Sequence, residues 1–125
     1  MRKIILLLLT SITCSLSYSQ DSIELRNQIQ KSFAEEQLIG KELNELVEQL
    51  SSYDTEVAWA DEPPGKLNGL FFFINDQLYI EVELVDIPKK SQLNMERTWE
   101  IDEVKSSKVH SIKIFYNNKL FEELK

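Results

Sequence analysis

The sequence has little of what most metal centres and many enzyme active sites are built from. It contains one cysteine, one histidine and three glycines in 125 residues. Transition-metal sites rely on cysteine and histidine ligands, so we expect no metal centre. A phosphate-binding loop needs several spaced glycines, and a serine nucleophile elbow needs glycines on both sides of the serine. Neither pattern occurs, and we expect no cofactor and no enzymatic activity.

The first 19 residues have the order of a secretory signal peptide. Arg2 and Lys3 precede an apolar run over residues 4–12, and small or polar residues follow as far as Ser19. This order is typical of a cleaved export signal, with small serines suiting a cut before Gln20. The apolar run is well short of the ~20 residues that a membrane-spanning helix needs. We therefore predict a signal peptide over 1–19 and no stable membrane span.

Cys14 allows a second interpretation, a lipoprotein signal in which this cysteine carries a lipid anchor. The residues ahead of it, Ser11 and Thr13, are not the leucine and small residue usual at such sites, so we favour simple cleavage. Residues 20–125 then form a single exported domain, periplasmic or secreted. That domain has no cysteine left, so its stability must come from packing and not from disulfides.

The chain is acidic. Its formal net charge is −7, and removal of Arg2 and Lys3 with the signal (−7 − 2) makes it −9. Such a charge repels phosphate backbones and anionic lipid, so we expect no nucleic-acid partner. Acidic residues concentrate in residues 51–104, which hold 12 Asp and Glu against 4 Lys and Arg. This excess either keeps the surface soluble or forms an acidic face for a basic partner.

Residues 21–50 carry a helical period in two segments. Apolar residues recur every four positions before Gly40, and at i, i+3, i+4 and i+7 after it. Gly40 marks either a kink or a junction, and we favour two helices because Leu38 and Ile39 lie off the first stripe. The two predicted core-facing stripes comprise Leu25, Ile29 and Phe33, then Leu43, Leu46, Val47 and Leu50.

From residue 53 onward the apolar period changes to two, which is typical of strands. The predicted strands lie at Val57–Trp59, 70–74, 78–85, Trp99–Ile101 and Val109–Tyr116, with residues 120–124 as a terminal strand or short helix. The fold class is therefore α+β: an N-terminal helix or helix pair packed on an antiparallel sheet of about four to five strands. In its strand, His110 falls on the side of Ile112 and Ile114, a position typical of a packed or edge residue and not of a ligand.

Two registers are open to the hairpin around residues 75–77. A three-residue loop puts Leu70, Phe72 and Ile74 on the face of Leu78, Ile80 and Val82. A two-residue loop moves Phe71 and Phe73 to that face instead, because a shift by one residue inverts every side chain. We favour the three-residue loop, since it keeps the aliphatic residues together.

In the favoured register, aromatic and acidic residues share the second face of the sheet. Clusters of exposed aromatic side chains mark binding sites. The same residues equally suit the core of a small domain without disulfides. If Phe71, Phe73 and Tyr79 were all buried under a helix or loop, the hypothesis that they bind a partner would be wrong. The candidate partner-binding residues are Phe71, Phe73, Tyr79, Glu81 and Glu83.

Some local motifs have a familiar order. The segment 38–41 leads into a helix, and residues 63–67 and Gly69 lead into an aromatic strand. Over residues 38–116 this order resembles uncharacterised small exported α+β proteins of Gram-negative bacteria. A fainter resemblance, to helix-plus-sheet domains of outer-membrane lipoproteins and β-lactamase-inhibitor folds, rests on the helix start at Gly40. These motifs are structural, so the resemblance implies a fold and carries over no functional residues.

The functional hypothesis that follows is an exported, non-catalytic domain that binds a protein through an acidic or aromatic sheet face, as an immunity protein or inhibitor would. The alternative is a carboxylate-dependent hydrolase of envelope glycan or peptide. A cleft holding two carboxyl groups about 5–10 Å apart would favour that enzyme. A structural envelope component is the third hypothesis.

Overall fold

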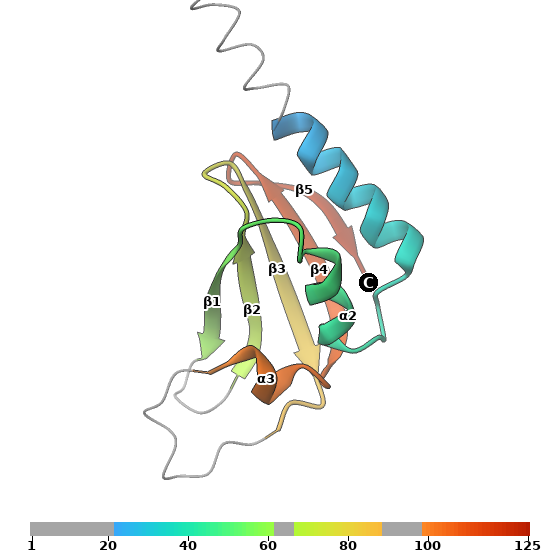
Figure 1. Cartoon of the computed structure of the whole chain (residues 1–125), viewed down its shortest axis with the longest axis vertical. Coiled ribbons are helices and arrows are strands. Elements are labelled where there is room, and N and C mark those ends of the chain that lie inside the picture. The colour runs from blue at the N-terminus through green and yellow to red at the C-terminus, as the bar shows by residue number, and fades with distance from the viewer. Residues whose placement is uncertain (1–21, 62–66, 89–98) are drawn as a thin grey trace, which may run out of the picture.

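Five antiparallel strands form one sheet in the order β1-β2-β3-β4-β5, preceded by two helices, in the computed structural model (Figure 1). The structure describes residues 22–61, 67–88 and 99–125. The predicted signal peptide, the Pro63–Lys66 loop and the connection over residues 89–97 lie outside the described residues. The α+β class with N-terminal helices is confirmed. After a helix over residues 22–36, the elements are α2 (Leu43–Gln49), β1 (Glu56–Asp61), β2 (Leu67–Phe73), β3 (Leu78–Val85), α3 (Ile101–Val104), β4 (Lys108–Tyr116) and β5 (Lys119–Leu124).

Both helices pack their predicted stripes against one face of the sheet, here called the inner face. The helix over residues 22–36 contributes Ile29 and Phe33, each 1% exposed, to the core. Helix α2 contributes Leu43 and Leu46, which are fully buried. The sheet side of the core consists of Leu67, Leu70, Phe72, Leu78, Ile80, Val82, Leu84, Val109, Ile112 and Ile114. The spacing of apolar residues at helical and strand periods therefore predicted both sides of the core.

Gly40 separates the two helices, as favoured from the sequence. Its φ of +83° is a left-handed conformation that glycine adopts without strain. The chain that follows runs beside the start of β4: the Gly40 amide donates to the Val109 carbonyl at 2.8 Å, and the Val109 amide donates to the Lys41 carbonyl at 2.8 Å. The Leu43 amide donates to the Ser107 carbonyl, also at 2.8 Å. These bonds fix α2 to the sheet by its first residues.

The β2–β3 hairpin has the favoured register. Leu70 pairs with Val82 and Phe72 pairs with Ile80, so the aliphatic residues share the inner face. The Ile74 amide donates to the Leu78 carbonyl at 3.0 Å and closes the three-residue loop. Phe71 and Phe73 consequently point to the opposite face of the sheet, which we call the outer face.

Asn75 holds this loop through its side chain. Its Oδ1 accepts hydrogen bonds from the backbone amides of Gln77 at 2.8 Å and Leu78 at 2.9 Å. We expect Asn75→Ala to lower the free energy of unfolding by about 1–2 kcal/mol, because two backbone donors lose their acceptor. Asn75→Asp keeps an acceptor oxygen, so its free energy of unfolding should fall by less than half as much as that of Asn75→Ala. Urea titrations of both variants measure the difference; equal losses would contradict a role for the acceptor.

Trp99 and Ile101 do not form the predicted fourth strand. Residues 101–104 are the short helix α3, and β3 pairs directly with β4, so no described strand separates these two in the sheet. Ile101 and Val104 are three residues apart, which puts both on one side of a helical turn, where Val104 is fully buried. Trp99 lies just before the turn and is 4% exposed. Two apolar residues at a spacing of two were too short a pattern to distinguish a strand from this turn.

His110 does not lie with Ile112 and Ile114, contrary to the prediction. Glu83 pairs with Ser111 and Leu84 pairs with Val109, which leaves His110 as the extra residue of a β-bulge. The bulge shifts the alternation, so Val109 is buried at 1% exposure and His110 is exposed. Regular alternation counted from Ile112 cannot show such an insertion.

The C-terminal segment forms a strand and not a helix. Asn117 and Asn118 have φ values of +50° and +62°, the two left-handed positions of a tight hairpin turn. Strand β5 then pairs with β4, from Tyr116 opposite Lys119 to Ile112 opposite Leu124. On the inner face, the Arg26 guanidinium lies 3.9 Å from the centre of the Phe121 ring, which ties the first helix to this last strand.

Candidate functional site on the outer face of the sheet

The strand register brings a row of large apolar side chains together on the outer face. Phe73 pairs with Tyr79, Tyr79 with Phe115, and Phe115 with Leu120, across four neighbouring strands. Paired residues of an antiparallel sheet point to the same side. We call Phe73, Tyr79, Phe115 and Leu120 the aromatic row. Glu56 of β1 pairs with Phe73 and ends the row at the edge of the sheet.

The rings of this row are in contact. Tyr79 and Phe115 stack with centroids 4.8 Å apart and 8° between their planes. The Phe73 and Tyr79 centroids are 5.6 Å apart. Phe71, two residues before Phe73 on β2, stacks on Phe73 with 6.2 Å between the ring centroids. These separations fall in the range where aromatic pairs attract one another. The rings therefore hold one another in place and form a preorganised apolar surface.

This surface is separate from the hydrophobic core. Phe73 is 39% exposed and Leu120 is 52% exposed, whereas Phe71, Tyr79 and Phe115 are half-buried. None of the five belongs to the core cluster or to the apolar residues packed against it. Within the described ranges, the helices contribute their buried side chains to the inner face only. The three predicted aromatic site residues are thus brought together and are not covered by a described helix.

Phe115 and Leu120 are members of the row that were not among the predicted site residues, and Phe115 is the one in contact with a predicted ring. Alternation from Ile112 and Ile114 already puts it on the opposite face of β4, since successive side chains of a strand alternate. Its position opposite Tyr79, however, depends on which strands are neighbours. That order follows from the replacement of the expected fourth strand by α3.

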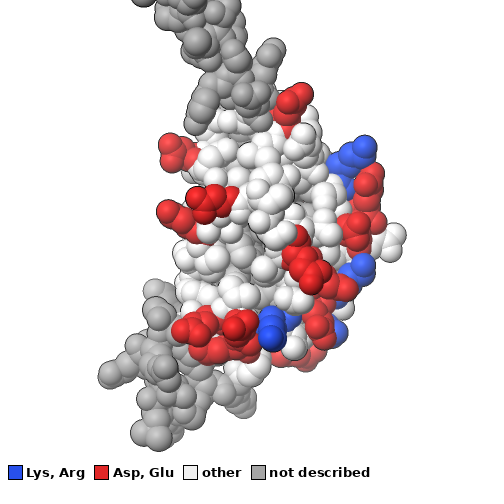
Figure 2. All heavy atoms as spheres, viewed as in Figure 1, with Lys and Arg blue, Asp and Glu red and all other residues white. Residues whose placement is uncertain are grey.

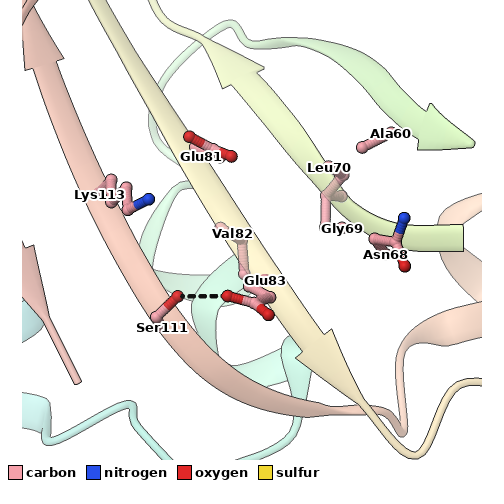
Figure 3. Close-up of a pocket in the computed structure, with 9 residues that line it drawn as sticks. All are labelled: Ala60, Asn68, Gly69, Leu70, Glu81, Val82, Glu83, Ser111 and Lys113. Atoms are coloured by element: carbon pink, nitrogen blue, oxygen red, sulfur yellow. Dashed lines mark hydrogen bonds between the residues drawn. The ribbon is translucent and has the colours of Figure 1, made fainter.

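Glu81 and Glu83, the two acidic site residues, also lie on the outer face. They line a hollow of about 170 Å³ whose other walls include Gly69, Ser111 and Lys113 (Figure 3). The Ser111 hydroxyl donates to a Glu83 carboxylate oxygen at 3.2 Å. Glu81 pairs across the strands with Lys113. Both carboxylates thus have a polar neighbour on β4.

A larger hollow lies where the aromatic row reaches the β2–β3 turn. Its volume is about 470 Å³, and we call it the hairpin hollow. Its lining residues include no lysine or arginine. They comprise three carboxylates, two aromatic rings and other turn residues, namely Asp54, Glu56, Asp76, Phe73, Tyr79, Ile74, Asn75 and Asn118.

No group of three or more His, Cys, Asp or Glu side chains in the described ranges is arranged to hold a metal ion. No described helix is long and apolar enough to cross a membrane. On the molecular face seen in Figure 2, acidic side chains outnumber basic ones. No family model, curated protein or solved structure matches the chain.

Proposed function

We propose that the protein is an exported, non-catalytic binding domain whose outer sheet face docks a partner protein. The observation that carries this proposal is the stacked aromatic row, which lies outside the core and is joined by Phe71. Aromatic side chains are favoured anchors in protein interfaces, because they bury a large area and lose little conformational entropy.

The position of these aromatics argues against a purely structural role. Core stability needs one buried sheet face, and the hydrophobic core already contains ten buried residues of the sheet. A solvent-facing side of an antiparallel sheet normally carries polar residues. The outer face instead has large apolar side chains at five positions, and all five remain partly exposed to water. A contiguous exposed apolar surface of this kind is typical of an interaction site.

The alternative, a carboxylate-dependent hydrolase, would use Glu81 and Glu83. Residues two apart on a strand are separated by roughly 7 Å, which suits paired carboxylate chemistry. The hollow that they line, however, has a volume of only about 170 Å³. Pockets that enclose a ligand usually measure roughly 300–1,000 Å³. The hollow beside Glu81 and Glu83 is smaller than such pockets, which favours binding over catalysis at these two residues.

An immunity or inhibitor role against an exported toxin or enzyme is the specific form of binding that we propose. Such a role needs a rigid surface that reaches its target outside the cytoplasm, and the predicted signal over residues 1–19 supplies the route. The acidic balance of the chain, −7 in total, would steer it toward a basic target surface.

The test is capture of a partner by the tagged protein, expressed from the full chain, from envelope extract and medium. We expect Phe73→Ser to reduce recovery of a stoichiometric partner at least tenfold, because it removes an anchor of the aromatic row. Val57→Ser is the matched control, since Val57 is 37% exposed, close to the 39% of Phe73, but points to the inner face.

Equal recovery with Phe73→Ser and with the unchanged protein would contradict the proposal. An equal loss with Val57→Ser would contradict it too, because the outer face would then have no special part in binding. Thermal unfolding of both variants checks that each remains folded under the conditions of capture.

A further inference from the structure

The charge around the aromatic row is uneven. At its β1 end, Asp54, Glu56 and Asp76 line the hairpin hollow and form no ion pair with a described residue. Toward β4 and β5 the outer face also carries cations, with Lys113 opposite both Glu81 and Glu123. The row therefore has an uncompensated negative end and a mixed opposite end.

This pattern argues against a second copy of the chain as the occupant of the outer face. Two such faces meeting around a twofold axis near the hairpin hollow would bring their carboxylates together, and like charges at an interface cost affinity. A partner that carries positive charge at this point and apolar side chains beyond it complements the surface instead.

The aromatic rings in the wall of the hairpin hollow favour a guanidinium group over an ammonium group. Phe73 and Tyr79 form part of its wall beside the carboxylates. A guanidinium group is planar, stacks on aromatic faces and binds carboxylates with two parallel hydrogen bonds, whereas an ammonium group is a compact, strongly hydrated charge. The chain itself provides an example on its inner face, where the Arg26 guanidinium lies 4.8 Å from the Tyr116 ring centre and 3.9 Å from that of Phe121.

The length of the row sets the spacing of the partner's residues. Neighbouring strands are about 4.8 Å apart, so the distance from Phe73 on β2 to Leu120 on β5 is roughly 14 Å. An extended peptide crossing the strands advances about 3.3 Å per residue and turns alternate side chains toward the surface. Three side chains at positions i, i+2 and i+4 would span about 13 Å and match the row.

We infer that the outer face binds an extended segment of a partner protein with the pattern Arg-x-Φ-x-Φ, where Φ is a large apolar residue. The arginine enters the hairpin hollow between Glu56, Asp76 and the Phe73 ring, and the apolar residues lie on Tyr79, Phe115 and Leu120. This inference rests on the proposed function and specifies the chemistry of the partner.

The test is a nuclear magnetic resonance titration of the isotope-labelled protein, expressed from the full chain, with the peptide acetyl-Arg-Ser-Leu-Ser-Leu-amide. We expect the backbone amide signals of Phe73, Asp76 and Tyr79 to shift. Replacement of the peptide's arginine by citrulline, its uncharged isostere, should raise the Kd at least tenfold. The double variant Glu56→Gln/Asp76→Asn should do the same, and both of its sites are exposed, so the fold tolerates the changes.

Equal Kd values for the arginine and citrulline peptides would overturn the inference, as would shifts confined to other surfaces or no shift at all. Concentration-dependent shifts of the same amides without peptide would also overturn it, because a second copy would then be the occupant. The proposed function is separable from these outcomes. Suppose that a captured partner is lost with Phe73→Ser but retained by Glu56→Gln/Asp76→Asn. The outer face would then still be the binding surface, and only the inference that the partner contributes an arginine would be wrong.

Discussion

Gly69→Ala is expected to destabilise the protein by roughly 3 kcal/mol or more, at the upper end of what one added methyl group costs in a packed structure. A Cβ at Gly69 would collide with the Val82 carbonyl oxygen and would lie 3.2 Å from the Glu83 Cα. All of the atoms in the way belong to the backbone of β3, so no side chain can rotate to make room. The strands β2 and β3 would have to separate at the centre of the sheet.

Gly40→Ala is the matched control for this prediction. Gly40 has open space around it but a φ of +83°, so an added Cβ meets strain and no collision. Its cost should be about 1 kcal/mol, the usual penalty for alanine in a left-handed conformation. Urea unfolding of the two variants compares the effects directly. A Gly69→Ala loss no larger than that of Gly40→Ala would show that β2 and β3 do not approach one another as closely as described.

Phe33→Ala is expected to lower the free energy of unfolding by about 3–5 kcal/mol. Phe33 is 1% exposed and is among the largest fully buried side chains, and it joins the helix over residues 22–36 to the sheet. Its removal takes away apolar area and leaves a cavity that the surrounding helix and strands cannot close completely. The first helix should then detach more readily, so protection of its amides from hydrogen exchange should fall more than that of β3.

Phe73→Ala provides the same chemical change at an exposed site. Because Phe73 is 39% exposed and packs on the rings of Phe71 and Tyr79, we expect a loss of about 1 kcal/mol, the value of aromatic contacts of this kind. Equal losses for Phe33→Ala and Phe73→Ala would contradict the assignment of one ring to the core and the other to a binding surface.

The parts of the fold that were predicted correctly depend on long periodic segments. The stripe of Leu25, Ile29 and Phe33 extends over about two helical turns. The alternation through Leu78, Ile80 and Val82 continues across a whole strand, so the first pattern indicates a helix and the second a strand. The hairpin register followed because only one choice buries the aliphatic residues together. Phe71, Phe73 and Tyr79 were then found on the same face as predicted.

The features that were missed are either too short to show a period or depend on which strands pair. The bulge at His110 inserts one residue into β4, and no local property of the sequence distinguishes it from regular strand. The turn at Ile101–Val104 is too short for a helical period to show. The hairpin hollow unites Asp54 and Asp76, which belong to different connections, and their proximity follows only from the pairing of β1 with β2.

Site-specific photocrosslinking in the cells that express the protein tests the binding face most directly. A photoreactive phenylalanine analogue replaces Phe73 in one strain and Val57 in another, and adducts are compared after irradiation. We expect one dominant adduct with a second protein from position 73 and at least tenfold less from position 57, because only Phe73 faces the partner. A dominant adduct from position 57, or equal yields from both positions, would contradict the proposed binding face.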